Sequence, residues 1–304
     1  MNPMTRLSQR LLSALIATAL CLLPGAAAWA DPAPSLTVGA KDFTEQLIMA
    51  EMTRQLLQSK GYTVHKKDGM GTKIVRAALE NGEVDLYWEY TGTSLVIFNK
   101  VTQRLSPQDV YQKVRELDGK KGLVWLAPSK VNSTYAVVVR PDNPKTDGMK
   151  TISDLAAGYK TGNTIAMGMT AEFPKRLDGL IGLQKTYGFE AGRANVRPMQ
   201  LNLAYNALAN GDLDTVVAQA TDGQIVALNL RMLADDAGFF PNYAMTPVIR
   251  QKVLDAHPGL KAVLESISMK LDDATMQRLN SEVDVRRKPI EAVAKSYLEE
   301  AGLL

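Results

Sequence analysis

The chain contains few of the side chains on which catalysis and metal binding usually depend. Its 304 residues include one cysteine, Cys21, and two histidines, His65 and His257. Neither histidine has the spacing of a metal ligand, and neither accompanies a serine or cysteine nucleophile motif. The sequence also has no P-loop and no G-x-G-x-x-G turn. We therefore expect no cofactor, no metal and no enzymatic activity, and we keep an exported hydrolase built from distant carboxylates as the least favoured alternative.

An excess of charge of one sign is also lacking. The chain has 35 basic and 32 acidic residues, and loss of Arg6 and Arg10 with a leader peptide would leave a net charge of +1. A near-neutral protein is a poor candidate for a nucleic-acid partner, which requires a strongly basic face. It is equally poor for anchoring to anionic lipid. With 46% hydrophobic and 22% charged residues, the composition is that of a globular protein.

The N-terminal apolar segment is too short to span a membrane. It runs from Leu11 to Leu23, below the ~20 residues that a bilayer requires, and no stop-transfer charges follow it. Two arginines precede it, and the small-residue sequence at 28–30 follows. This arrangement is typical of a secretory signal peptide. We predict a signal over residues 1–30, cleavage after Ala30, a periplasmic location and a mature chain without Cys21.

Hydrophobic periodicity predicts alternating strands and helices in the first part of the mature chain. Strands are expected at 36–39, 62–66 and 84–88, with helices at 44–60 and 73–81 between them. This β-α-β-α-β order is typical of a parallel sheet with helices on its faces. Ligands of such sheets bind beyond the carboxyl ends of the strands. The turns that begin at Lys41 and Tyr90 follow two of those ends.

The length of the mature chain favours two lobes. Two prolines in the segment 141–145 suggest that the chain first crosses between the lobes there. The segment 239–248 is predicted to carry the chain back to the first lobe. A second α/β series lies between them, and the helical tail 253–304 is broken at Pro258 and Pro289. We expect an α/β protein whose first lobe comprises 31–138 and 241–304 and whose second comprises 139–240. A small molecule would bind in the cleft between them.

The sequence D-L-Y-W-E-Y-T-G-T at 85–93 is the most informative stretch. Tyrosine presents a flat, electron-rich face to a cation, while a threonine hydroxyl and a backbone N–H can donate to an anion. One turn could therefore contact both ends of a zwitterion. The ordinary explanation is a strand end with aromatic side chains packed at its edge. This segment alone does not decide between the two.

Seven segments in order identify a family. They are G-A-K-D-F-T-E-Q at 39–46, G-E-V-D-L-Y-W-E-Y-T-G-T at 82–93, N-S-T-Y-A at 132–136, R-L-D-G-L at 176–180, K-T-Y-G-F at 185–189, T-D-G-Q-I at 221–225 and P-N-Y-A-M-T-P-V at 241–248. Together they resemble the periplasmic glycine betaine and choline binding proteins of osmoprotectant ABC transporters, the OpuC/ProX/OsmF-like group. The resemblance implies a two-lobed, type II (Venus-flytrap) periplasmic binding protein fold. It also implies a small quaternary-ammonium ligand and ABC permease subunits as partners, and we expect a monomer.

The resemblance also implies a set of ligand-binding residues. The ligand's quaternary ammonium would lie in a box of tyrosines, to which Tyr90, Tyr135 and Tyr243 correspond. Its carboxylate would be held by Lys41, Thr93 and Arg176. Arginine's planar guanidinium suits a carboxylate better than lysine's point charge. The ordinary explanation of Lys41 and Arg176 is exposed surface charge, Arg176 within a helix, and lone tyrosines are more often packed at interfaces.

Gln219 departs from the family pattern, since many relatives have a tyrosine three residues before the aspartate of T-D-G. Loss of one ring could weaken binding of a trimethylammonium group by roughly tenfold. Gln219 could instead bind a ligand hydroxyl or the N–H of a less methylated amine. A receptor for a polar amino acid or such an amine is therefore the alternative. A receptor that serves a sensory membrane protein also stays open.

Several neighbouring residues receive structural predictions. Asp85 and Glu89 could orient Lys41 or Arg176, and Asp222 is expected to cap a helix beginning near Gln224. The aromatic residues expected in the core are Tyr87, Trp88, Tyr187 and Tyr205.

Overall fold

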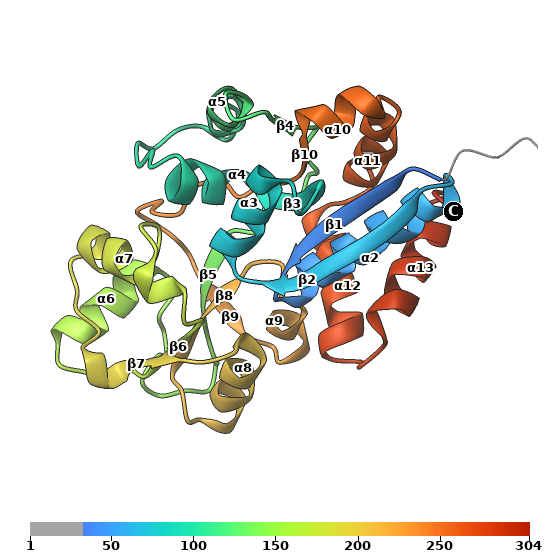
Figure 1. The fold of residues 1–304 in the computed structure, drawn as a ribbon. Coiled ribbons are helices and arrows are strands. Elements are labelled where there is room, and N and C mark those ends of the chain that lie inside the picture. Colours follow the sequence, from blue (N-terminus) through green and yellow to red (C-terminus); the bar gives the residue numbers. More distant parts are fainter. Residues whose placement is uncertain (1–32) are drawn as a thin grey trace, which may run out of the picture. The chain divides into compact units, whose positions relative to one another are not determined.

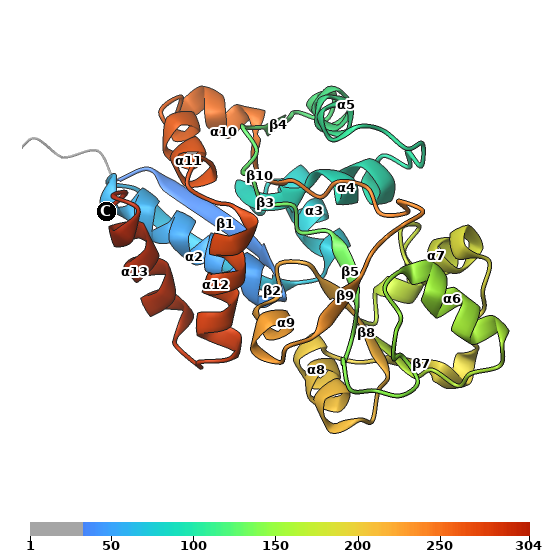
Figure 2. The same ribbon diagram turned by 180° about the vertical axis from the view of Figure 1, so that it is seen from behind.

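The structure is a computed structural model that describes residues 33–304. The predicted signal peptide, its cleavage point at Ala30 and Cys21 lie outside the described residues. Two separate sheets form the framework of the rest, and Figures 1 and 2 show them from opposite sides.

The first sheet has five strands in the order β2-β1-β3-β10-β4. Strands β1 and β2 are parallel, as are β1 and β3, while β10 is antiparallel to both β3 and β4. The strands are β1 (Ser35–Lys41), β2 (Thr63–Met70), β3 (Leu86–Tyr90), β4 (Leu123–Trp125) and β10 (Met245–Arg250). The predicted β-α-β-α-β unit is confirmed, but β3 extends two residues beyond its predicted end at 88. The extension includes Glu89. The hydrophobic pattern ended the predicted strand before this charged residue, but Glu89 is buried and its carboxylate accepts hydrogen bonds from neighbouring groups.

Helices surround this first sheet and complete the first lobe. Helix α13 packs beside α2, as both views show, and α12 contacts the same helix. The helices are α2 (Thr44–Ser59), α3 (Thr72–Asn81), α4 (Thr91–Thr93), which continues as a π-helical turn (Ser94–Phe98), α5 (Pro107–Gly119), α10 (Gln251–Ala256), α11 (Leu260–Ser268), α12 (Asp273–Asp284) and α13 (Ile290–Glu300). The helical tail with breaks at Pro258 and Pro289 is confirmed.

The second sheet also has five strands, in the order β7-β6-β8-β5-β9. Its strands are β5 (Tyr135–Val139), β6 (Met167–Met169), β7 (Val196–Pro198), β8 (Thr215–Gln219) and β9 (Arg231–Leu233). The helices of this second lobe are α6 (Ile152–Lys160), α7 (Leu180–Tyr187), α8 (Leu201–Asn210) and α9 (Gly223–Ala227), with short 3₁₀ turns at Phe173–Lys175 and Arg193–Asn195. Strand β6 is parallel to β7 and β8, whereas β5 is antiparallel to β8 and β9.

The chain passes between the sheets twice. The first crossing lies between β4 and β5, over residues 126–134, which is earlier than the predicted crossing at 141–145. The reason is that all five residues of β5 pair with β8 in the second sheet. The prolines at 141 and 144 follow that strand in a turn. The second crossing, between β9 and β10, overlaps the predicted return at 239–248.

Helix ends show which local signals the sequence carries. Ser106 caps α5, and Thr151 forms a reciprocal capping box with Asp154 at the start of α6. Helix α3 is different, because its N-cap residue is Gly71, which has no side chain to accept from the first backbone N–H groups. A residue from the second lobe takes this role, as described below.

The predicted structural aromatics lie in the core. Tyr87, Trp88, Tyr187 and Tyr205 are all buried. The indole of Trp88 donates to the Thr53 hydroxyl at 2.9 Å, so its polar atom is satisfied inside the first lobe.

Candidate ligand-binding site

A cavity of about 350 Å³ lies where strand ends of the two sheets meet. The first lobe contributes residues that follow β1 and β3, and the second contributes residues that follow β6 and the end of β8. Small-molecule sites in α/β proteins usually lie at the carboxyl ends of strands, and a cavity of this size can hold such a ligand.

Six of the seven predicted ligand-binding residues line this cavity. They are Lys41, Tyr90, Thr93, Tyr135, Arg176 and Gln219. Tyr243 is the seventh, and the structure does not bring it to the cavity surface. Its side chain is 2% exposed, its hydroxyl donates to Asp178 at 2.5 Å, and its ring meets Tyr135 edge-on with centroids 5.5 Å apart. Tyr243 therefore supports Tyr135 from behind.

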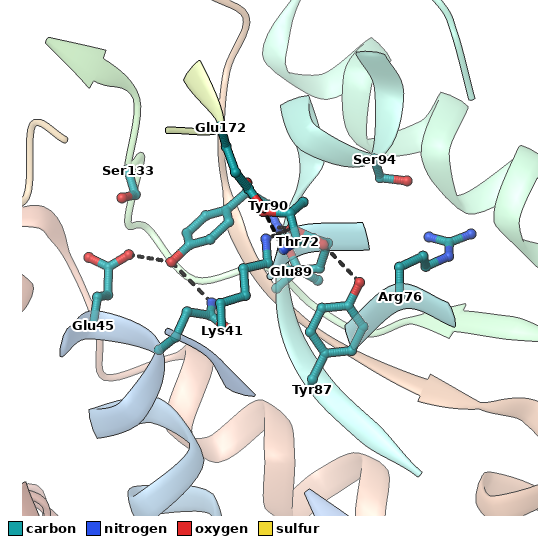
Figure 3. Close-up of polar contacts among 12 residues, drawn as sticks. Lys41, Glu45, Thr72, Arg76, Tyr87, Glu89, Tyr90, Ser94, Ser133 and Glu172 are labelled. Atoms are coloured by element: carbon teal, nitrogen blue, oxygen red, sulfur yellow. Dashed lines mark hydrogen bonds and ion pairs between the residues drawn. The ribbon is translucent and has the colours of Figure 1, made fainter. Parts of the chain in front are cut away.

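Lys41 is buried at the end of β1 and is paired with an acid. Its Nζ atom lies 2.5 Å from Oε1 of Glu89, which is 0% exposed, and 4.8 Å from the ring centroid of Tyr90. Glu89 also accepts from the Tyr87 hydroxyl and from the backbone N–H of Tyr90, each at 2.7 Å. Figure 3 shows this group around Lys41. Burial lowers the pKa of Lys41, while the charge of Glu89 opposes that shift.

The prediction that Glu89 orients Lys41 is confirmed, whereas the same prediction for Asp85 is wrong. Asp85 accepts from the backbone N–H of Thr37 at 2.8 Å and pairs with Arg250 at 3.3 Å. These contacts tie β1 and β10 to the start of β3. They lie at the opposite end of the strand from Tyr90.

Arg176 does not lie in a helix, contrary to the prediction. It follows the 3₁₀ turn Phe173–Lys175 in an extended conformation, with φ −84° and ψ 149°. Pro174 and the close approach of Gly179 to the Phe173 carbonyl favour this irregular turn over a helix. The Arg176 guanidinium donates twice to Asp178, from Nε at 2.7 Å and from Nη2 at 2.6 Å. Its charge is therefore directed into the protein, with Cζ 5.4 Å from the ring centroid of Tyr135.

Two phenylalanines complete the aromatic lining and were not among the predicted residues. Phe43 stacks on Tyr90 with centroids 6.2 Å apart, and Phe173 meets Tyr135 at 5.0 Å. Phe43 lies within the G-A-K-D-F-T-E-Q segment two residues after Lys41, which was the available signal. Phe173 precedes Arg176 by three residues, but no local pattern shows that its ring faces a cavity.

The hydroxyl of Tyr90 is held by α2. It donates to Oε1 of Glu45 at 2.6 Å and accepts from Nε2 of Gln46 at 3.0 Å. Glu45 is 2% exposed, and its second oxygen accepts from the Thr221 hydroxyl of the second lobe at 2.6 Å. Burial raises the pKa of Glu45. Sequence reasoning missed this residue, because its partner lies 176 positions away in the chain.

Gln219 ends β8 opposite Tyr135. Its backbone N–H donates to Asp222 at 3.0 Å, and Asp222 also accepts from the Tyr205 hydroxyl at 2.8 Å. Asp222 occupies the N-cap position of α9 but makes no side-chain cap bond, so its predicted capping role is wrong. Its carboxylate bonds backwards to β8 instead. Burial raises the pKa of Asp222 to about 7.

Contacts between the lobes occur on both sides of the cavity. The carboxylate of Glu172, which follows β6, accepts from the backbone N–H of Thr72 at 3.2 Å and from its hydroxyl at 2.8 Å. Glu172 thereby supplies the cap that α3 lacks. The bond from Thr221 to Glu45 joins the lobes at a second point.

Thr93 is 4% exposed and lines the cavity. Among residues 33–304, its hydroxyl makes no hydrogen bond. A buried hydroxyl normally has a partner, so this side chain is available to a bound molecule.

Within the part of the chain that the structure describes, no three or more histidine, cysteine or acidic side chains converge to hold a metal ion. In the same residues, no helix combines the length and hydrophobicity needed to cross a membrane.

The two sheets, the two crossings and a cavity at their strand ends define a two-lobed, type II periplasmic binding protein. The crystal structure of a glycine betaine/carnitine/choline ABC transporter shares this fold with a TM-score of 0.72 and 30% identity, over 88% of this chain and 99% of that one. Residues 34–300 match the family described as the substrate binding domain of ABC-type glycine betaine transport systems. The chain belongs to this family, and it is a substrate-binding protein of an ABC importer.

Two further relatives agree with this assignment. A glycine-betaine-binding protein of Pseudomonas aeruginosa is 38% identical over 90% of this chain and 89% of its own length. The glycine betaine-binding protein YehZ of Escherichia coli is 31% identical over 95% of this chain and 97% of its own. Both are named as binding proteins, and the family's members work in the periplasm or outside the cell.

Proposed function

We propose that this protein binds a small quaternary-ammonium osmoprotectant, glycine betaine, choline or a related compound, in the interlobe cavity and delivers it to an ABC permease. One observation carries the proposal: aromatic rings and basic side chains from both lobes line the same cavity. Phe43 and Tyr90 come from the first lobe, and Tyr135 and Phe173 from the second. A trimethylammonium group has no N–H to donate and is stabilised by ring faces and by loss of water.

Roles for the cavity residues follow from this arrangement. We assign the cation to the rings of Tyr90 and Tyr135, with Tyr243 holding Tyr135 in place. We assign the polar end of the ligand to Thr93, to the remaining N–H groups of Lys41 and Arg176, and to Gln219. Because the contacts come from both lobes, a ligand would favour the state in which the lobes meet, and a permease that recognises that state would register occupancy.

Export to the periplasm also belongs to this proposal. It is supported by the signal-like composition of residues 1–30 and by the family's location in the periplasm or outside the cell. N-terminal sequencing of the protein purified from the periplasm tests it, with Asp31 expected as the first residue.

Calorimetry with purified mature protein tests the ligand class. We expect binding of fully methylated amines and a decrease in affinity from betaine to its dimethyl and monomethyl analogues, because each lost methyl reduces contact with the rings and adds an N–H. Affinity that rises as methyl groups are lost would favour the alternative, a receptor for a less methylated amine or a polar amino acid. That alternative rests on Gln219, whose side-chain carbonyl oxygen could accept a hydrogen bond from such an N–H.

A further inference from the structure

We propose that Asp42 and Glu172 make this cavity selective for ligands of net positive charge, so that a quaternary amine without a carboxylate binds more tightly than the zwitterion with the same head group. This inference rests on the proposed function and specifies the ligand class of the same site. It follows from the pairing of the charged side chains around the cavity.

Both basic side chains of the cavity are already neutralised by buried acids. Lys41 pairs with Glu89, and Arg176 makes two hydrogen bonds to Asp178, which is 3% exposed. A carboxylate that approached either base would compete with an acid that cannot move into water. The two bases therefore attract a ligand anion less than their number suggests.

Two acids of the same cavity have no basic partner. Within residues 33–304, neither Asp42 nor Glu172 takes part in an ion pair, and both line the cavity. Glu172 is fixed by its bonds to the backbone N–H and hydroxyl of Thr72, at the N-terminal end of α3. A negative charge in this position also interacts favourably with the partial positive charge of the helix N-terminus. Figure 3 shows Glu172 and Thr72 beside Lys41 and Tyr90.

The charged groups therefore do not balance. Lys41 and Arg176 contribute two positive charges, and their partners Glu89 and Asp178 together with the exposed Asp42 and Glu172 contribute four negative charges, a balance of −2 for the cavity's charged residues and their ion-pair partners. Lys73, Lys100 and Lys175 share a separate, adjoining pocket with Glu172 and do not line this cavity. Besides the remaining N–H groups of the two paired bases, the groups available to the ligand's polar end are neutral: the Thr93 hydroxyl and the Gln219 amide. A hydroxyl-bearing cation matches these groups without bringing a second negative charge.

Calorimetry with choline and glycine betaine at pH 8 and low salt tests the inference. Burial raises the pKa of Asp42, so the measurement is made well above the usual carboxyl range. We expect the wild type to bind choline more tightly than betaine. Glu172→Gln and Asp42→Asn should each weaken choline binding by about three- to tenfold, the effect of removing one partly screened charge from the cavity wall.

The same substitutions should leave the affinity for betaine within about twofold of the wild-type value. Removing a negative charge weakens attraction of the ligand's ammonium but also reduces repulsion of its carboxylate, and the two effects oppose each other. The glutamine at 172 can still bond Thr72, so the cap of α3 is retained. Glu190→Gln serves as the matched control, since Glu190 is exposed and lies outside the cavity. It should change neither affinity.

A second measurement does not depend on any variant. In wild-type protein, raising the salt concentration should weaken choline binding more than betaine binding. Tighter binding of betaine than of choline, or an unchanged choline-to-betaine ratio in both variants and in salt, would overturn the charge selectivity while leaving the proposed function intact. Failure of both ligands to bind would overturn the proposed function itself.

Discussion

Replacing Arg176 with methionine removes one partner of a buried ion pair at the cavity wall. Asp178 would keep only the Tyr243 hydroxyl as a hydrogen-bond donor and would remain buried without a cation. Breaking a buried pair in this way typically destabilises a protein by about 3 to 5 kcal/mol. We expect the free energy of unfolding of Arg176→Met to fall by an amount in this range.

A double-mutant cycle separates the pair from simple loss of packing. Asp178→Asn in the Arg176→Met background removes the uncompensated charge but keeps the bond from Tyr243. The double variant should therefore be more stable than Arg176→Met alone, with a coupling energy of about 1 to 3 kcal/mol. Urea unfolding at pH 7, followed by tryptophan fluorescence, measures all four proteins. Arg193→Met is a suitable control, because Arg193 is exposed on the same lobe.

The binding readout is independent of stability. If Arg176 meets the carboxylate of a zwitterion, the double variant should lose more affinity for betaine than for choline, which has no carboxylate. If the free energy of unfolding of Arg176→Met falls by less than about 1 kcal/mol, the ion pair does not stabilise the fold as argued. If the double variant loses equal affinity for betaine and choline, Arg176 does not contact the ligand's carboxylate.

Two further predictions concern the second lobe. Gln219→Tyr should tighten binding of fully methylated ligands by up to about tenfold in calorimetry, because it adds a ring face to the cavity; no gain would assign Gln219 a polar role of its own. Asp222→Asn should flatten the pH dependence of stability between about pH 4 and 7. The folded-state pKa of Asp222 is raised to about 7, so its protonated form contributes stability that is fully present below pH 4 and is lost as pH rises through 7, at up to about 1.4 kcal/mol per pH unit. Urea unfolding of wild type and variant at pH 4, 5, 6 and 7 measures this slope, and equal slopes would contradict the burial argument.

The sequence predicts elements whose signals are local. The periodicity of 44–60 and 73–81, and the apolar runs between them, suffice for the β-α-β-α-β unit because each pattern lies within one element. Placing Lys41 and Tyr90 near each other also succeeds, since the carboxyl ends of neighbouring parallel strands meet at one edge. The family resemblance supplied the second-lobe residues that this logic does not reach.

The remaining features depend on contacts between distant segments. Tyr243 follows a recognisable motif, yet only its contacts with Tyr135 and Asp178 show that it stands behind the cavity wall. The charge pattern at 175–178 looks like an exposed helix face, whereas Pro174 and the tight packing at Gly179 turn Arg176 toward Asp178. Glu45 is an acidic residue in the first turn of a helix, and nothing nearby indicates that it bonds to Thr221.

The position of β10 has a consequence for folding. This strand, residues 245–250, fills the place between β3 and β4 in the first sheet, and α13 packs against α2. Strands β3 and β4 therefore lack their shared neighbour until almost the whole polypeptide is available. Pairings of such long sequence separation form slowly. Under the proposed export, a first lobe that is completed late would favour passage through a secretion channel that accepts only unfolded polypeptide.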